Sequence, residues 1–129
     1  MDDRAREIDE VLSLIQNRAL GMMREHGLVG WRFAWDDRRR SYGRCQYGTK
    51  TISISRRLAL LNEWAQTKET ILHEIAHALV GPGHAHDAAW HAKARQIGCR
   101  GGARYGAEVR SPGTVQKFEF SKWADQEGR

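Results

Sequence analysis

The sequence predicts an α+β fold with an N-terminal helix, a small antiparallel sheet of three strands, and then two further helices. Apolar residues recur at spacings of three and four near the N-terminus and again in the second half of the chain, which is typical of helices. Between these two regions, large and small residues alternate with a period of two, which is typical of half-buried strands.

The first helix is expected over residues 3–27. Asp2 or Asp3 can cap its start, and Gly27 follows its expected end. Its apolar residues would form one buried stripe, made of Ile8, Val11, Leu12, Ile15, Ala19 and Met22.

Three strands are expected over residues 31–35, 42–47 and 51–55, separated by polar turns at 36–40 and 48–49. Short connections of this kind favour hairpins, so the sequence predicts an antiparallel meander. The aromatic residues of the first strand are expected in the core.

Two helices are then expected, over residues 62–80 and 87–98. Gly81-Pro82-Gly83 ends the first of them, because proline cannot continue a helix and glycine permits the turn. Residues 114–120 are a candidate short strand. The 129 residues suit a single domain, with a core over about 3–99 and an extension over 100–129.

The composition narrows the class of protein. No apolar run is long enough to cross a bilayer, and the charged N-terminus lacks the apolar region of a secretory signal. We therefore expect a cytoplasmic (intracellular) protein with no membrane partner. The two cysteines, Cys45 and Cys99, are too few for a four-cysteine zinc ribbon and are expected to be reduced thiols.

Positive charge is concentrated in one segment. Residues 36–57 contain seven basic and two acidic residues, and this segment alone accounts for the net charge of +5. A basic surface over residues 38–57 favours DNA or another polyanion as a partner. A solvated rim with no partner explains the same charges equally well. The basic residues are Arg38, Arg39, Arg40, Arg44, Lys50, Arg56 and Arg57.

His73-Glu74-Ile75-Ala76-His77 is the strongest chemical signal in the chain. Two histidines four residues apart lie on one face of a helix, so both can reach one metal ion at about 2 Å. Nitrogen ligands favour Zn²⁺ over magnesium or calcium. Glu74 follows the first ligand and is placed to take a proton from a metal-bound water, so we predict Glu74 as the catalytic base.

The third metal ligand has three candidates, which are His84, His86 and His91. His86 begins the next helix, where a rigid element can present it, while His84 lies close to the preceding helix end and His91 one turn further on. Spacing favours His86 without excluding the other two. A fourth position should stay open for water, as in catalytic zinc sites.

These residues resemble those of the SprT-like zinc metallopeptidases. The resemblance covers about residues 30–99, and its specific part is His73-Glu74-Ile75-Ala76-His77-Ala78 followed by His86-Asp87-Ala88-Ala89-Trp90. Gly43-Arg44-Cys45, the strand over residues 52–55 and Ile97-Gly98 also match the usual pattern of the family.

The resemblance implies a zincin-like fold, zinc on His73, His77 and His86, and hydrolysis of a protein or peptide substrate with Glu74 as general base. Asp87 stands where the family usually has glycine, and no cysteine follows Cys99, so the zinc ribbon of many members is missing. Eukaryotic relatives degrade proteins crosslinked to DNA, and only this analogy extends that substrate class to the chain.

The expected reaction leaves several points open. The substrate is expected to lie extended, added to an edge of the sheet. Arg44, Tyr42 and Tyr105 are the candidates for stabilising the oxyanion. Two alternatives use the same histidines: a metal-dependent nuclease, which Glu74 argues against, and a non-catalytic zinc-containing DNA-binding or adaptor protein.

Overall fold

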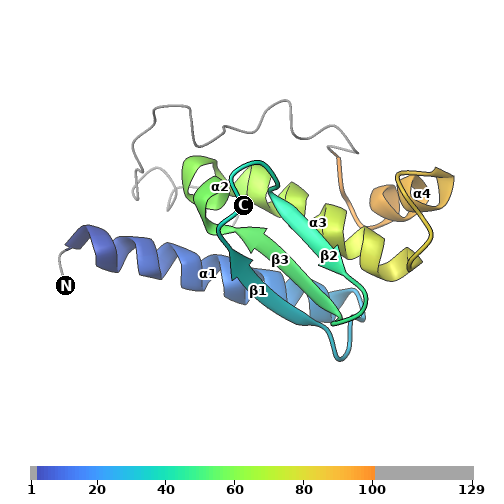
Figure 1. The fold of residues 1–129 in the computed structure, drawn as a ribbon, viewed down its shortest axis with the longest axis horizontal. Helices are drawn as coiled ribbons and strands as arrows, with labels where there is room; N and C mark the ends of the chain where they lie inside the picture. The colour runs from blue at the N-terminus through green and yellow to red at the C-terminus, as the bar shows by residue number, and fades with distance from the viewer. Residues whose placement is uncertain (1–2, 101–129) are drawn as a thin grey trace.

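The structure is a computed structural model that describes residues 3–100 of the chain (Figure 1). It confirms the α+β class. None of the helices in this range is long and apolar enough to cross a membrane. In chain order the elements are α1 (Asp3–Glu25), β1 (Arg32–Asp36), β2 (Gly43–Gln46), β3 (Thr51–Ser55), α2 (Arg56–Leu61), α3 (Trp64–Val80) and α4 (Ala88–Gln96).

The sheet is mixed, so the prediction of an antiparallel meander is wrong. Its strand order is β1-β3-β2, and β3 pairs antiparallel with β2 but parallel with β1. Residues 37–42 do not form a hairpin between neighbouring strands. They connect β1 to β2 across the end of β3, which lies between these two strands, so the connection spans two strand spacings, or about 10 Å. An alternating pattern shows which residues form strands, but it does not show which strands pair.

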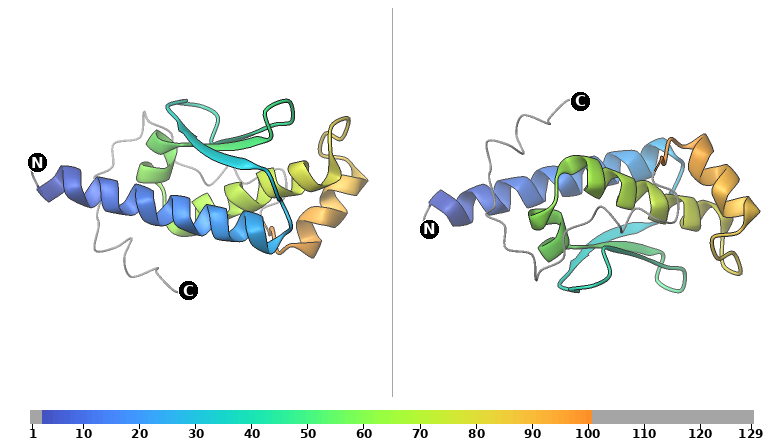
Figure 2. Two further views of the ribbon diagram at one scale, coloured as in Figure 1. Left: turned by 90° about the horizontal axis from the view of Figure 1, so that it is seen from below. Right: turned by 90° about the horizontal axis from the view of Figure 1, so that it is seen from above.

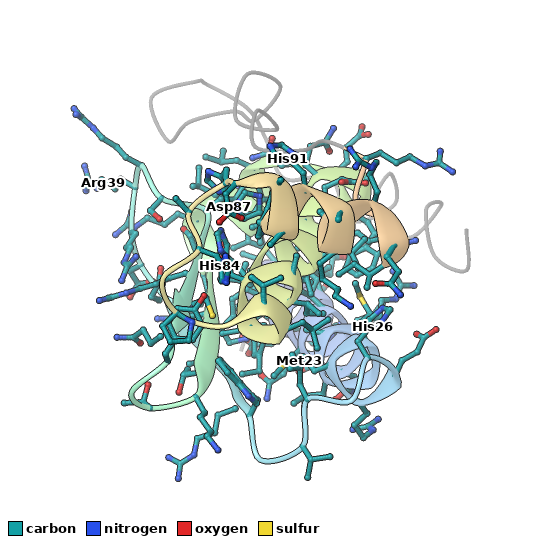
Figure 3. The ribbon with its side chains drawn as sticks, turned by 90° about the vertical axis from the view of Figure 1, so that its right-hand side faces the viewer. Met23, His26, Arg39, His84, Asp87 and His91 are labelled. Carbon is teal, nitrogen blue, oxygen red and sulfur yellow. The ribbon has the colours of Figure 1, made fainter. Side chains whose placement is uncertain are left out.

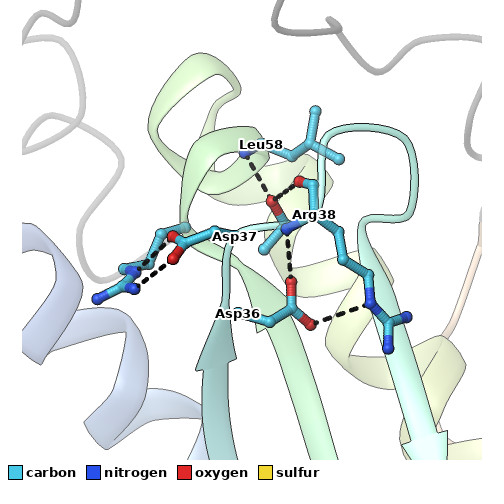
Figure 4. A network of polar contacts seen from close by, with 6 residues as sticks. Asp36, Asp37, Arg38 and Leu58 are labelled. Carbon is cyan, nitrogen blue, oxygen red and sulfur yellow. Dashed lines mark hydrogen bonds and ion pairs between the residues drawn. The ribbon is translucent and has the colours of Figure 1, made fainter.

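Side-chain contacts hold residues 37–42, the crossover loop between β1 and β2 (Figure 4). The Asp36 carboxylate accepts the backbone N–H of Arg38 at 3.1 Å, and Arg56 forms an ion pair with Asp37 at 2.9 Å. The Ser55 hydroxyl donates to the Arg38 carbonyl at 2.6 Å and accepts the Leu58 N–H at 3.2 Å. Ser55, the last residue of β3, therefore binds the crossover loop and caps α2 with the same side chain.

Helices α1 and α3 cover one face of the sheet (Figure 2). The main core lies between them and β3, whose apolar side chains Ile52 and Ile54 are fully buried. Helix α1 lines the other side of this core; three residues of its predicted stripe are buried, whereas Ile8, Leu12 and Met22 are only partly buried. The buried residues of α1 are Val11, Ile15, Ala19 and Met23.

Helix α3 has well-defined ends. Glu63 and Gln66 form a capping box at its start, which satisfies backbone N–H groups that the first turn leaves without partners. Gly81 has a φ of 90°, and its N–H donates to the His77 carbonyl at the other end. Such a left-handed φ favours glycine, as the Gly-Pro-Gly pattern predicted.

Helix α4 packs on α3 through a second, smaller core. Trp90 is fully buried there and Ala94 nearly so, whereas Ala89 is exposed. Leu72 and Ala76 of α3 supply the opposite wall. This core attaches α4, and the segment that leads into it, to the half of α3 that carries the histidine motif.

Candidate metal centre

Helix α3 carries His73, Glu74 and His77 on the face of the sheet that α1 and α3 cover. The side chains of His73 and Glu74 are almost completely buried, and His77 is half-buried. The imidazole rings of His73 and His77 lie one helical turn apart, with centroids separated by 5.0 Å.

His86 joins these two histidines from the segment before α4. Its Nε2 lies 2.9 Å from Nε2 of His73 and 3.1 Å from Nε2 of His77. One nitrogen from each of the three rings falls within 4.8 Å of the others, and within residues 3–100 this is the group of histidine, cysteine or carboxylate side chains that could hold a metal ion. The structure therefore brings the three predicted ligands together.

The donor set fits a zinc ion. Two nitrogens bound to one tetrahedral zinc at about 2.0–2.1 Å lie about 3.3 Å apart, close to the two separations found. Metal binding needs neutral imidazoles. Burial lowers the pKa of His77, His86 lowers it further, and Asp87 raises it, so the net effect favours the neutral ring.

The other two candidate ligands have different contacts (Figure 3). His84 Nδ1 lies 2.8 Å from the Asp87 carboxylate, which also accepts the Trp90 N–H as the N-cap of α4. The His91 ring packs edge-on against Trp90 at 5.0 Å. Neither ring belongs to the group of three that could hold a metal.

Trp90 supports all three candidate ligands. Its ring lies 4.6 Å from that of His73, 4.7 Å from that of His86 and 5.4 Å from that of His77, measured between centroids. Its indole N–H donates to the His73 carbonyl at 3.3 Å. The sequence placed Trp90 in the family motif but did not predict these contacts, because a motif does not show which side chains a residue touches.

Glu74 lies in an environment that favours its neutral form. Burial raises its pKa to about 8, an effect opposed by the charge of Arg38. A cation bound by the neighbouring histidines would lower this pKa again, because it stabilises the carboxylate. Arg38 was predicted only as part of a basic surface, and its position near Glu74 depends on the crossover loop.

Tyr47, at the end of β2, holds the C-terminal half of α3. Its hydroxyl donates to the His77 carbonyl at 2.8 Å. Burial raises the pKa of Tyr47 to about 12, and burial likewise raises that of Cys45 to about 12, so both groups stay protonated near neutral pH. This contact joins β2 to the helix that carries two of the three histidines.

Two of the candidates for oxyanion stabilisation, Tyr42 and Arg44, are not brought to the histidines. The buried Tyr42 hydroxyl makes a short hydrogen bond with Thr67, near the start of α3. Arg44 is exposed on β2, and Tyr105 lies outside the described residues. The described part of the site therefore consists of three imidazoles, one carboxylate and the groups that support them.

Comparison with protein families identifies the family of the chain. The model of the SprT-like family matches residues 11–111 of the chain. This range contains every site residue described above and confirms the resemblance drawn from the sequence. Searches of curated proteins and of solved structures found no match.

Proposed function

The chain belongs to the SprT-like family, and from this premise we propose that it is a zinc-dependent metallopeptidase. One observation carries the proposal: the Nε2 atoms of His73, His77 and His86 converge, and the residue that follows His73 on α3, Glu74, is a buried carboxylate. Three neutral nitrogen ligands leave a tetrahedral zinc ion with one position for water or substrate, which is the arrangement of catalytic zinc sites.

Zinc bound at these histidines would polarise the scissile carbonyl and lower the pKa of a water molecule. Glu74 would accept a proton from that water and deliver it to the leaving amine. Its burial supports this role, because desolvation opposes the lowering of the Glu74 pKa by a bound cation and so keeps the carboxylate basic enough to accept a proton.

The free edge of β2 is the proposed site for the substrate backbone. In the described sheet β2 pairs with β3 on one side only, and it packs on α3 beside Glu74. An extended peptide can add to such an edge through main-chain hydrogen bonds, which bind without strong dependence on sequence.

We also propose that the substrates include proteins held on DNA. Arginines are exposed on the loop between β1 and β2 (Arg39 and Arg40), on β2 (Arg44) and on α2 (Arg57), and Figure 3 shows Arg39 projecting away from the body of the protein. Arg38 and Arg56 contribute less to this surface, because they form ion pairs with Asp36 and Asp37. Replacing Arg39 and Arg40 by alanine should weaken single-stranded DNA binding and reduce its dependence on salt concentration.

The first experiment measures bound zinc by elemental analysis, together with cleavage of casein and histones with and without single-stranded DNA. We expect one zinc per chain, and we expect Glu74→Gln to abolish cleavage while keeping the zinc. Zinc without cleavage of any substrate would instead favour a DNA-binding or adaptor protein. Nuclease activity that survives Glu74→Gln would favour a nuclease.

The assignment of His86 has a matched control in the chain. His84 lies two residues away but contacts Asp87, so His86→Ala should lose most of the bound zinc and His84→Ala should retain it. Equal zinc contents in the two variants would contradict the assignment.

A further inference from the structure

Gly43 of β2 lies directly against the side chain of Glu74. A Cβ atom built on Gly43 would fall 2.9 Å from Oε2 and 3.0 Å from Cγ of Glu74, and 2.7 Å from Cγ2 of Thr70. Real Cβ atoms essentially never make contacts below 3.0 Å. No other amino acid therefore fits at this position without moving the neighbouring side chains.

Space, and not backbone conformation, requires glycine at this position. The described glycines with positive φ are Gly27, Gly30, Gly81, Gly83 and Gly98, and Gly43 is not among them. Gly43 lies in a regular strand opposite Ile54 of β3, in a backbone conformation that any residue can adopt. The missing side chain lets β2 approach α3 closely.

The two neighbours of Gly43 occupy successive turns of α3. Thr70 and Glu74 are four residues apart, so they lie on the same face of the helix, and this face is turned toward β2. Glu74 is thereby confined between its own helix and the backbone of the strand. Arg38 acts on the carboxylate through its charge.

We propose that Gly43 is a positioning residue for Glu74, an inference that rests on the peptidase function proposed above. The bare backbone of β2 forms the wall that keeps the Glu74 carboxylate beside the three histidines. A side chain at position 43 would displace the carboxylate from this place. The displacement would impair proton transfer without removing any group that takes part in it.

The two contacts predict separable effects of Gly43→Ala. The Thr70 methyl group is fixed close to its helix, so its clash with the new Cβ should lower stability. The Glu74 carboxylate is at the end of a flexible side chain and can swing away, so its clash should lower activity. A misplacement of about 1 Å at a reacting group can cost about 100-fold in rate.

The kinetic test compares Gly43→Ala with Gly48→Ala, since a Cβ on Gly48 has no heavy atom within 4 Å. We expect Gly43→Ala to lower kcat about 100-fold, with little change in KM or in bound zinc. Gly48→Ala should keep the kcat of the original protein. An unchanged kcat in Gly43→Ala would overturn the proposal.

A second variant separates positioning from loss of fold. Thr70→Ser removes Cγ2 but keeps the hydroxyl that donates to the Gln66 carbonyl at 2.9 Å. Added to Gly43→Ala, it should restore part of the midpoint of urea unfolding while kcat stays low, because the contact with Glu74 remains. If kcat recovers together with stability, the loss came from the fold and the proposal fails.

The contact can also be tested without any measure of activity. Urea unfolding at one fixed zinc concentration would be followed for Gly43→Ala, Glu74→Ala and the double variant. Gly43→Ala should shift the midpoint less when Glu74 is already alanine, because one clash has been removed. Equal shifts in both backgrounds would overturn the inference. Unequal shifts in a protein that cleaves no substrate would instead count against the peptidase function alone.

Discussion

Trp90 combines packing and hydrogen bonding at the candidate metal centre. It contacts all three imidazole rings and donates to the carbonyl of His73. Groups that orient metal ligands in this way commonly change metal affinity by 10–100-fold when they are replaced. The position of the histidines therefore depends on a residue that is not itself a ligand.

We expect Trp90→Phe to lower zinc affinity about 10-fold, because phenylalanine keeps an aromatic ring but loses the N–H donor. Competition with a chromophoric chelator would measure this change. Trp64→Phe is the matched control, since Trp64 is buried at the other end of α3. An equal loss of affinity in both variants would show that the effect is not specific to Trp90.

The buried Glu74 predicts a pH dependence of stability in the metal-free protein. Its pKa is about 8 in the fold, against an ordinary value of 4.5. The unfolded chain therefore releases this proton at lower pH, and the free energy of unfolding should fall by a few kcal/mol as pH rises from about 5 to 8. Urea unfolding in EDTA would measure it. Glu74→Gln should remove most of this decrease, and a parallel decrease in the variant would show that another group causes it.

At the residue scale, the sequence predicted the site residues whose positions follow from a local pattern. Two histidines at a spacing of four need only a helix to meet, so His73 and His77 could be paired from the sequence alone. His86 could be favoured but not separated from His84 and His91, because the path of a loop is not periodic. Arg38 and Gly43 lie near Glu74 because of the order in which the strands pair and because β2 packs on α3. A local sequence pattern does not show either of these features.

At the scale of elements, Asp87 is the N-cap of α4, at the position where the family usually has glycine. Its φ of −87° and ψ of −173° are extended, so this position needs no glycine. Its carboxylate instead accepts the N–H of Trp90 at 3.0 Å and binds His84. The departure from the family pattern thus adds a helix cap next to His86.

Removing this cap should destabilise the segment that carries His86. We expect Asp87→Ala to lower the free energy of unfolding, and Asp87→Asn to lower it less because the amide oxygen can still accept the N–H. Thermal unfolding would compare the two variants. A larger loss in Asp87→Asn than in Asp87→Ala would show that charge, and not capping, is the main contribution.

The sequence predicted the long helices but not the short one. Periodicity over many residues identified α1 and α3, because each helix is long enough for its buried residues to form a clear apolar stripe in the sequence. Helix α2 spans only Arg56–Leu61 and follows β3 without a break, so it is too short for its apolar residues to show a helical period. Its start depends on the Ser55 hydroxyl, which also binds the crossover loop.

At the scale of the whole molecule, a bound metal would join two parts of the chain, helix α3 and the segment before α4. A ligand that binds only the folded state stabilises it by about 2.7 kcal/mol at a free concentration 100 times its Kd. We therefore expect EDTA to lower the Tm by about 10 °C for a domain of this size. His73→Ala should have the same Tm with and without EDTA. A Tm of the original protein that does not respond to EDTA would exclude a metal that stabilises the fold.

The division of the three ligands between a helix and a loop also has a consequence for exchange kinetics. His73 and His77 are carried by α3, which packs in both cores, whereas His86 is exposed and follows Gly81 and Gly83 in its connecting segment. Opening of such a loop requires far less free energy than global unfolding. Metal ions should therefore enter and leave by detachment of His86 while the rest of the protein stays folded. The residence time of the metal would then be set by the loop and its cap at Asp87, independently of how stable the domain is.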